Sequence, residues 1–332
     1  MNDTFIIAEA GVNHNGDITL AEKLIDVAAE SKANAVKFQT FKPDALVTRN
    51  TPKAAYQKAL TGETEGQLQM LRKLALSAED HQHLKRYCEK RDITFLSSPF
   101  DLESIEFLLN LGISLFKIPS GEITNLPYLR KIGESGLPVI LSTGMSLLDE
   151  VAAAANALVS AGTPQDQLIL LHCNSQYPTA FHDVNLRAMM KMGATLGCPV
   201  GYSDHTPGIE VPIAAVALGA IVIEKHFTLS KDMEGPDHKA SLDPEELKLM
   251  VQGIRNIEES LGSSEKKPTT SEEENRGLAR KSLVAARTIV KGEVFSAENL
   301  TAKRPGTGTS PMEWDDVIGK TAERNYEMDE PI

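Results

Sequence analysis

The sequence predicts an α/β protein in which an eight-stranded parallel (β/α)8 TIM barrel is followed by a small domain of short strands. Between residue 5 and about residue 262, short apolar runs alternate with longer amphipathic segments, which is the pattern of repeated strand–helix units. Eight such runs fit a closed barrel, which needs about 250 residues. A polar stretch then separates this part from the last residues of the chain.

The predicted strands are short, apolar and rich in β-branched residues. They are Phe5–Ala8, Ala35–Gln39, Ile93–Ser98, Leu115–Ser120, Val139–Thr143, Leu168–Asn174, Val200–Asp204 and Ile221–Phe227. The sequence therefore predicts the strand of each of the eight strand–helix units.

The segments between the strands have recognisable helix ends. Asp17 can cap one helix, and Asp101 can cap another that Gly112 ends. The clearest helix begins after Asp243, with Pro244 at its first position. Its apolar face consists of Leu247, Met250, Ile254, Ile257 and Leu261, and Gly262 ends it.

The composition predicts three regions. Residues 1–262 form the barrel, and residues 263–278 form an exposed linker because they are polar, charged and nearly free of apolar side chains. Residues 279–332 form the small domain, with short strands expected at 282–286 and 288–290. A domain of only about fifty residues is marginal alone, so we expect it to dock on another surface.

The net charge of -12 argues against a nucleic acid or an anionic membrane as a partner. Three cysteines, Cys88, Cys173 and Cys198, form neither an even set nor a CxxC spacing, so we expect reduced thiols in the cytoplasm. No apolar run approaches the ~20 residues that cross a bilayer, and the amino terminus lacks the features of a signal peptide. The sequence predicts a cytoplasmic protein with no membrane association.

Polar residues follow every predicted strand, where a barrel of this kind places its functional groups. The clusters are Glu9 with Asn13 and His14; Lys37 with Gln39; Ser97 with Ser98; Lys117 with Ser120 and Glu122; Ser142 with Thr143; Asn174 with Ser175; Ser203 with Asp204 and His205; and Glu224 with His226. We expect an active site at this end of the barrel.

Two lysines lie inside apolar strands, Lys37 in AVKFQT and Lys117 in LFKIPS. A buried lysine needs a fixed anion or carboxylate beside it. With the nearby hydroxyls of Ser98, Ser120, Ser142 and Ser203 as neutral donors, they predict an anionic ligand such as a phosphate or carboxylate. The alternative is that each lysine extends to the barrel rim and each serine only ends its strand.

His205 and His226 end neighbouring strands, so their imidazoles can reach one ion. Two histidines with oxygen ligands suit Mn²⁺ or another divalent metal. Glu9 and Asp237 are candidate carboxylates near the ion or the substrate. The segment GVNHNG lacks the GxGxxG spacing, so a dinucleotide site is not predicted.

Longer segments resemble one enzyme family. They are IIAEAGVNHNGD, AVKFQTFKPD, FLSSPFD, FKIPSGEITNLPYL, ILSTGM, LLHCNSQYPT, GYSDHT, IEKHFT, GPDHKASL and KRPGTG. In order and over the whole chain they are similar to the nonulosonic acid synthases, which comprise the bacterial sialic, legionaminic and pseudaminic acid synthases. The resemblance implies a barrel with a small antifreeze-like (SAF, β-clip) domain. It also implies condensation of phosphoenolpyruvate with an open-chain acylamino sugar, with release of phosphate.

The resemblance also implies roles for individual residues. His205 and His226 match metal ligands, for Mn²⁺ first and Mg²⁺ or Co²⁺ as alternatives. The positions on the phosphoenolpyruvate side are Lys37, Ser98, Lys117, Ser120, Ser142, Ser175 and Ser203, and those on the sugar side are Glu9, Gln39, Tyr177 and Asp237. Arg304 matches a residue that reaches the sugar from the partner's small domain, which implies a domain-swapped homodimer. Glu9 or Glu122 is expected to move the proton, and Lys37 and Lys117 to stabilise the phosphate.

The sequence departs from the best-known sialic acid synthases at two places. Ser98 replaces a commoner threonine, and Asn174-Ser175 replaces a Thr-Asn pair. Segments such as FLSSPFDLESI and VGYSDHTPGI look closer to legionaminic acid synthases. The acceptor is therefore either 2,4-diacetamido-2,4,6-trideoxymannose or N-acetylmannosamine. Two other functions stay open: a Schiff-base pyruvate aldolase that uses Lys117, and a glycan-binding protein without catalysis.

Overall fold

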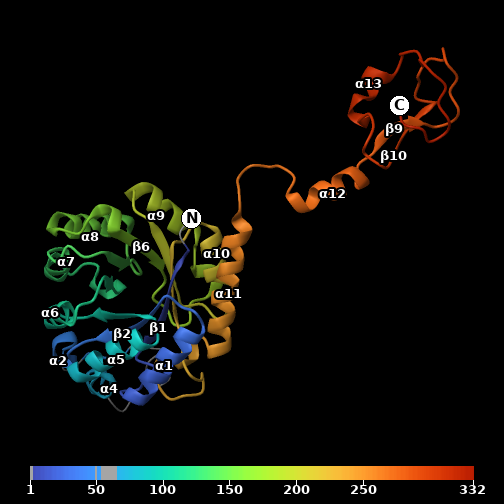
Figure 1. Ribbon diagram of the computed structural model, residues 1–332. Coiled ribbons are helices and arrows are strands. Elements are labelled where there is room, and N and C mark those ends of the chain that lie inside the picture. Colours follow the sequence, from blue (N-terminus) through green and yellow to red (C-terminus); the bar gives the residue numbers. More distant parts are fainter. Residues whose placement is uncertain (1–2, 49–50, 54–65) are drawn as a thin grey trace. The chain divides into compact units, whose positions relative to one another are not determined.

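A computed structural model describes residues 3–48, 51–53 and 66–332 of the chain. The chain divides into two compact units, Met1–Gly262 and Ser263–Ile332, and each is described by itself. The first unit consists of strands surrounded by helices (Figure 1).

Within the described residues, eight parallel strands build one sheet in the first unit. They are β1 (Phe5–Gly11), β2 (Ala35–Thr40), β3 (Thr94–Pro99), β4 (Phe116–Ile118), β5 (Val139–Ser142), β6 (Leu168–Cys173), β7 (Val200–Asp204) and β8 (Val222–His226). The strand order is β3-β2-β1-β8-β7-β6-β5-β4, and β3 and β4 at its two ends also contact each other. The predicted barrel is confirmed, with strand ends shifted by a few residues.

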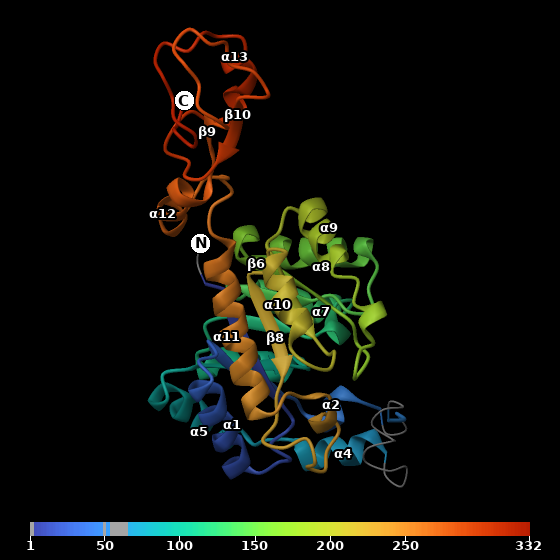
Figure 2. The ribbon, with the colours of Figure 1, turned by 90° about the vertical axis from the view of Figure 1, so that its right-hand side faces the viewer.

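Helices follow the strands and cover the outside of the barrel (Figures 1 and 2). They are α1 (Ile18–Glu30), α2 (Pro43–Leu46), α4 (Gln67–Leu74), α5 (Ala78–Lys90), α6 (Leu102–Leu111), α7 (Leu126–Gly133), α8 (Leu148–Ala161), α9 (Arg187–Leu196), α10 (Glu210–Ala217) and α11 (Pro244–Leu261). Short 3-10 turns lie at Ser120–Glu122, Gln165–Gln167, Phe181–Asp183 and His238–Ala240. None of the described helices is long and apolar enough to cross a membrane.

The predicted helix caps are confirmed. The carboxylate of Asp17 accepts a hydrogen bond from the first turn of α1, and that of Asp101 does the same for α6. Gly112 ends α6 in the left-handed conformation with φ of 78°, which costs glycine little. Asp243 and Glu246 form a reciprocal capping box at the start of α11. Local sequence therefore sets where these helices begin and end.

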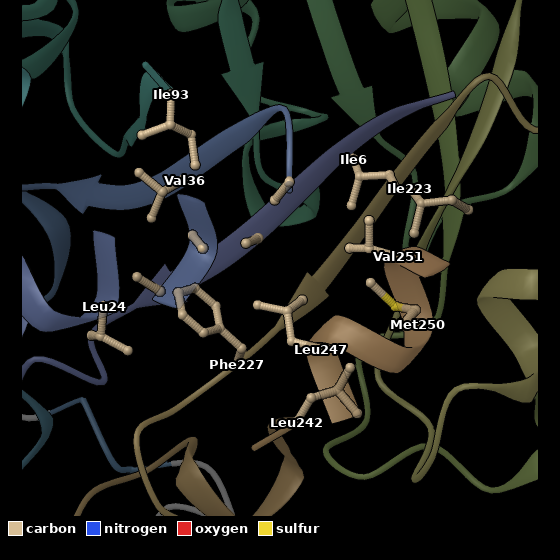
Figure 3. Packing of buried hydrophobic residues seen from close by; sticks show 14 of the residues in the cluster. Ile6, Leu24, Val36, Ile93, Ile223, Phe227, Leu242, Leu247, Met250 and Val251 are labelled. Carbon is tan, nitrogen blue, oxygen red and sulfur yellow. The ribbon is translucent and has the colours of Figure 1, made fainter. Parts of the chain in front are cut away.

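The main core lies between the barrel wall and the helices. Figure 3 shows Ile6 of β1 and Ile223 of β8 packed near Leu247, Met250 and Val251 of α11. All five side chains are buried. The packing fixes α11 against the strands that begin and end the barrel.

A second, smaller cluster fills the inside of the barrel, and it positions the site. It contains Ile7, Ala35, Leu96, Ile140, Leu171 and Val222. Because side chains alternate along a strand, the residue two positions further along each strand faces the same interior. These following residues are Glu9, Lys37, Ser98, Ser142, Cys173 and Glu224. The interior therefore has an apolar floor with a polar layer directly above it.

The second unit has its own core, formed by Leu283, Ala285, Ile289, Phe295, Leu300, Val317 and Ala322. It contains an antiparallel pair, β9 (Ser282–Ala285) and β10 (Leu300–Lys303). It also contains α12 (Thr270–Ala279), a 3-10 turn at Pro311–Glu313, and α13 (Trp314–Val317). The strand predicted at 288–290 is wrong, since only Ile289 makes an isolated bridge, to Tyr326.

The stretch predicted as a linker is exposed, but much of it is the helix α12. The prediction missed this helix because the segment has no apolar face to give a helical period. The cap was visible in the sequence, since Thr269 and Glu272 form a capping box.

Replacing Leu247 by alanine should destabilise the barrel by about 2–5 kcal/mol, because it leaves a cavity in the core between α11 and the sheet. Leu249→Ala, two residues away on the same helix and 58% exposed, is the matched control and should stay within about 0.5 kcal/mol of the parent protein. Urea unfolding followed by circular dichroism measures both. Equal losses in the two variants would contradict the assigned packing of α11.

Candidate active site

A pocket of about 280 Å³ opens at the carboxyl ends of the barrel strands. Most of the residues that the sequence predicts for the site line it: Glu9, Lys37, Gln39, Ser98, Lys117, Ser120, Ser142, Ser175, Tyr177, Ser203, His205, His226 and Asp237. They come from all eight described strands or from the loops that follow them. The fold thus brings together groups that are more than two hundred residues apart in the sequence.

Lys37 is buried at the centre of an ionic network. Its Nζ lies 3.0 Å from Oε2 of Glu9 and 3.5 Å from Oε2 of Glu224. It also donates a hydrogen bond of 3.0 Å to the Ser98 hydroxyl. Burial alone would lower the pKa of Lys37, but the Glu224 and Glu9 carboxylates outweigh it and raise the pKa. The Lys37 ammonium is therefore a fixed positive charge.

Lys117 reaches the same network from β4. Its Nζ lies 3.3 Å from Oε1 of Glu224, and that oxygen also accepts a hydrogen bond of 3.1 Å from Ser203. Burial would raise the pKa of Glu224, but Lys117 and Lys37 overcome burial and lower this pKa to about 2. Burial lowers the pKa of Lys117 itself. Glu224 is thus a permanent anion between two ammonium groups.

Glu9 differs from Glu224 although the two carboxylates share Lys37. Burial is the largest effect on Glu9, and it raises the pKa to about 7 against the opposing charge of Lys37. Gln39 donates a weak hydrogen bond of 3.4 Å to Oε1 of Glu9. A carboxyl group with this pKa can take up or release a proton near neutral pH.

A cluster of hydroxyl groups, from Ser120, Ser142 and Ser175, also lines the pocket. Ser120 Oγ accepts a hydrogen bond of 3.0 Å from the Gly144 amide. A Cβ atom at Gly144 would lie only 2.4 Å from Ser175 Oγ, so glycine lets the two serines approach. In the described part of the chain, the buried Ser142 hydroxyl has no hydrogen-bond partner. A buried hydroxyl without a partner is suited to bind a ligand oxygen.

The rings of His205 and His226 lie with their centroids 5.5 Å apart. His205 Nδ1 is 2.6 Å from the Asn174 carbonyl, so Nδ1 carries the proton and Nε2 has a free lone pair. Burial lowers the pKa of His205 to about 4 and that of His226 well below its usual value. Both imidazoles are therefore neutral.

These properties fit a metal site. Metal-binding histidines are neutral and usually donate their second N–H to a carbonyl or carboxylate, as His205 does. His226 Nδ1 is buried, and no described residue bonds to it. Over residues 3–48, 51–53 and 66–332, no group of three or more His, Cys, Asp or Glu side chains is arranged to hold an ion.

Tyr177 and Asp237 close one side of the pocket. The Tyr177 ring lies 4.0 Å from the His205 ring and edge-on to that of His226. Burial raises the pKa of Asp237 to about 6. The loop that carries Asp237 is tied to the loop after β1, where Asn15 donates a hydrogen bond of 2.9 Å to the Glu234 carbonyl.

Two predicted residues lie elsewhere. Glu122 is absent from the described residues that line the pocket, and its carboxylate accepts a hydrogen bond of 2.7 Å from Asn125. The chain leaves β4 in a 3-10 turn, which directs Glu122 towards the start of α7. The geometry therefore gives no support to Glu122 as a proton carrier. Arg304 is exposed in the second unit, just after β10.

Sequence reasoning gave no role to Glu224, although it is the most highly connected carboxylate of the site. A signal for Glu224 was present in the sequence. Glu224 and His226 are two residues apart, so both side chains lie on one face of β8, as those of Lys37 and Gln39 do on β2. The apolar side of the pocket was also missed. It is formed by Val12, Met70, Leu71, Leu74, Phe100 and Met145, whose sequence pattern does not distinguish them from core residues.

Comparison with known proteins places the chain among sugar-acid synthases. Residues 24–266 match the NeuB family, and residues 280–332 match the SAF domain, which confirms the predicted small domain. The chain is 52% identical, over its whole length and 99% of the relative, to the N,N'-diacetyllegionaminic acid synthase of Campylobacter jejuni. It is 51% identical to the synthase of the same name from Legionella pneumophila, over 97% of this chain and 91% of the relative.

A solved structure is similar as well. It is the N-acetylneuraminic acid (sialic acid) synthetase from Leptospira borgpetersenii in complex with citrate, with a TM-score of 0.72 and 36% identity. The match covers 82% of this chain and 90% of that chain.

The raised pKa of Asp237 predicts a pH-dependent stability difference. Because the folded pKa of about 6 exceeds the ordinary value of 3.8, the folded protein binds this proton more tightly than the unfolded chain. Its contribution is complete below pH 3.8 and is lost as the pH rises through 6. The Asp237→Asn variant has no ionisable group at this position. Its free energy of unfolding minus that of the parent protein should therefore rise by about 3 kcal/mol between pH 4 and 7.

Urea unfolding at several pH values between 4 and 7 measures this difference. Asp232→Asn is the control, because Asp232 is an exposed carboxylate in the same loop and should show no comparable gain. Parallel stability curves for the parent protein and Asp237→Asn would show that Asp237 is not held in a desolvated position.

Proposed function

The chain belongs to the NeuB family, and we propose that it condenses phosphoenolpyruvate with an open-chain acylamino sugar and water to give a nonulosonic acid and phosphate. The observation that carries this proposal is the pair of buried lysines beside a free hydroxyl and two neutral histidines in one pocket. Lysines with hydroxyl donors suit a small, highly charged anion. The relatives that are half identical to this chain are named as N,N'-diacetyllegionaminic acid synthases.

Phosphoenolpyruvate would occupy the side of the pocket that contains Lys37 and Lys117. Ser98, Ser120, Ser142 and Ser175 line the same pocket and would donate hydrogen bonds to phosphate and carboxylate oxygens. Ser203, which donates to Glu224, would turn its hydroxyl to the ligand. The enol carbon would attack the sugar aldehyde, water would add to the former enol carbon, and phosphate would leave. The fixed ammonium groups would stabilise the charge on the departing phosphate.

The sugar would occupy the side lined by Glu9, Gln39, Tyr177 and Asp237. His205 and His226 would hold a divalent metal, Mn²⁺ first and Mg²⁺ or Co²⁺ as alternatives, which would supply a Lewis acid for the aldehyde oxygen. Tyr177 contacts both histidine rings and would restrict the position of the bound sugar. Glu9, with a pKa of about 7, would exchange the proton that the reaction requires.

The apolar side of the pocket supports 2,4-diacetamido-2,4,6-trideoxymannose as the acceptor. Val12 follows Glu9 in the chain, and Leu71 and Leu74 belong to α4, which follows Gln39 and β2. These apolar side chains line the same pocket as Glu9 and Gln39. This acceptor has a methyl group where N-acetylmannosamine has a hydroxymethyl group, and it has a second acetyl group. A hydrophobic wall favours such groups modestly over a hydroxyl.

We also propose that the protein is a domain-swapped homodimer in which Arg304 reaches the sugar in the barrel of the partner subunit. The exposure of Arg304 next to β10 leaves its guanidinium available for such a contact. In a dimer with closed two-fold symmetry, each barrel would receive Arg304 from the other subunit.

A cytoplasmic location completes the proposal. The buried cysteines Cys88, Cys173 and Cys198 are all free thiols, and reduced cysteines are usual in the cytoplasm.

Phosphate release from phosphoenolpyruvate tests the proposed reaction. Release should require an acceptor and should be faster, by kcat/KM, with 2,4-diacetamido-2,4,6-trideoxymannose than with N-acetylmannosamine by about 10- to 200-fold, the range that one apolar group provides. A chelator should abolish release, and added Mn²⁺ should restore it. Turnover that survives metal removal would refute the metal role.

The alternative aldolase is tested with the same protein. Borohydride reduction in the presence of pyruvate should not attach pyruvate to Lys117, as mass spectrometry of the digested chain would show. Covalent trapping at Lys117, without phosphate release, would favour the Schiff-base reaction instead. Absence of both reactions would favour a binding protein.

Mixing two inactive variants tests the shared site. In a mixed dimer of Arg304→Ala and His205→Ala chains, one barrel would have intact histidines and would receive an intact Arg304 from its partner. Random pairing should therefore restore about a quarter of the parent activity, since half of the dimers would contain one complete site. No recovery after exchange of subunits, verified by mass spectrometry of differently tagged chains, would exclude a site completed by the partner.

A further inference from the structure

A buried ion pair lies next to the histidine pair but outside the pocket. Lys225 of β8 binds the carboxylate of Asp204 of β7, and both side chains are fully buried. The two residues are direct partners in the pairing of β7 with β8. Each of them immediately precedes a histidine of the site, since His205 follows Asp204 and His226 follows Lys225.

The alternation of side chains along a strand separates the two pairs. His205 and His226 line the pocket, whereas Asp204 and Lys225 do not belong to its lining among the described residues. The ion pair therefore fastens the same two strands from the helix side. It does so one residue before each histidine.

The carboxylate of Asp204 also closes a turn around His205. It accepts hydrogen bonds from the Thr206 amide, at 3.1 Å, and from the Thr206 hydroxyl, at 3.0 Å. Lys225 Nζ in turn donates a hydrogen bond of 2.6 Å to the Thr206 carbonyl. The backbone on both sides of His205 is thus tied to β8.

Other contacts of His205 come from the loop after β6. Its carbonyl accepts a hydrogen bond of 2.8 Å from the Thr179 amide, and its Nδ1 bonds the Asn174 carbonyl. These contacts fix the ring relative to the loop after β6. The distance from His205 to His226 depends instead on how β7 and β8 are joined. The backbone pairing and the Ser203–Glu224 hydrogen bond join the two strands, and the pair of Asp204 and Lys225 adds a side-chain link one residue before each histidine.

We propose that Asp204 and Lys225 are positioning residues that set the separation of His205 and His226 and thereby the affinity of the site for a divalent metal. This inference rests on the metal site of the proposed function. General energetics support a positioning role, because a buried ion pair adds little to stability compared with apolar residues of the same size. Its benefit here is a fixed geometry between two strands.

The test uses the full-length chain, freed of metal, with Mn²⁺ as the probe. The double variant Asp204→Leu/Lys225→Met removes both charges together, so no unpaired charge stays buried. Titration followed by electron paramagnetic resonance should show Mn²⁺ affinity reduced by about 10- to 100-fold, as for other residues that orient metal ligands. The midpoint of thermal unfolding of the metal-free variant should stay close to that of the parent protein.

The matched control is the exposed ion pair of Glu106 and Lys131, whose nitrogen and oxygen lie 2.9 Å apart. Glu106→Gln/Lys131→Met should leave Mn²⁺ affinity unchanged. A folded Asp204→Leu/Lys225→Met variant that binds Mn²⁺ as the parent protein does would overturn the positioning role alone. A parent protein that binds no Mn²⁺, Mg²⁺ or Co²⁺ would overturn the metal site itself.

A milder variant decides the question if the double variant does not fold. Thr206→Val removes only the hydroxyl that bonds to Asp204 and keeps the shape of the side chain. A loss of Mn²⁺ affinity of several-fold in this variant, with the unfolding midpoint retained, would support the positioning role. Unchanged affinity would refute it.

Discussion

Lys37 and Lys117 are buried in the barrel mouth, where their charges depend on carboxylates: Lys37 is paired with Glu9 and Glu224, and Lys117 with Glu224. An apolar floor lies beneath these residues. Each strand that contributes an aliphatic side chain to the floor contributes its next inward-facing residue to the polar layer above it. A charge in that layer is neutralised from another strand: Glu9 reaches Lys37 from the neighbouring strand β1, and Glu224 reaches both lysines from β8, which neighbours neither of their strands. The alternation of side chains along the strands therefore places the lysines and the carboxylates in one layer of the barrel. An anionic substrate would enter a site in which the lysines are already held by carboxylates.

The side chains of β7 and β8 also alternate between the two faces of the sheet, and both faces contain polar pairs. Inward the strands present Ser203, Glu224 and the histidines, and outward they present the buried pair of Asp204 and Lys225. One strand pairing thus fixes an ionic contact in the helix layer and the candidate metal ligands in the mouth. A displacement of either strand would disturb the Asp204–Lys225 pair and the histidine pair together. The buried ion pair therefore helps to keep the histidines in position.

Much of this arrangement could be predicted from the sequence, and the exceptions have physical causes. Strand–helix periodicity predicted the barrel, strand-end polarity predicted twelve lining residues of the pocket, and the family resemblance added Tyr177. The position of Glu122 outside the pocket lining could not be predicted, because proximity in sequence to Ser120 says nothing about the 3-10 turn that redirects its side chain. The apolar wall near α4 was missed because Leu71 and Leu74 have the same pattern in a pocket as in a core. Contacts across the barrel, such as that of Glu224 with Lys117, depend on strand order and have no local signal.

The contrast between Glu9 and Glu224 identifies which carboxylate can move a proton. Both are buried and both contact Lys37, but only Glu224 also contacts Lys117. The second ammonium group outweighs burial at Glu224 and lowers its pKa to about 2, whereas burial prevails at Glu9 and raises its pKa to about 7. Two carboxylates whose surroundings separate their pKa values in this way usually divide the work of a site. Glu224 can hold the lysines in place as a permanent anion, and Glu9 is left as the carboxyl group that can exchange a proton near neutral pH.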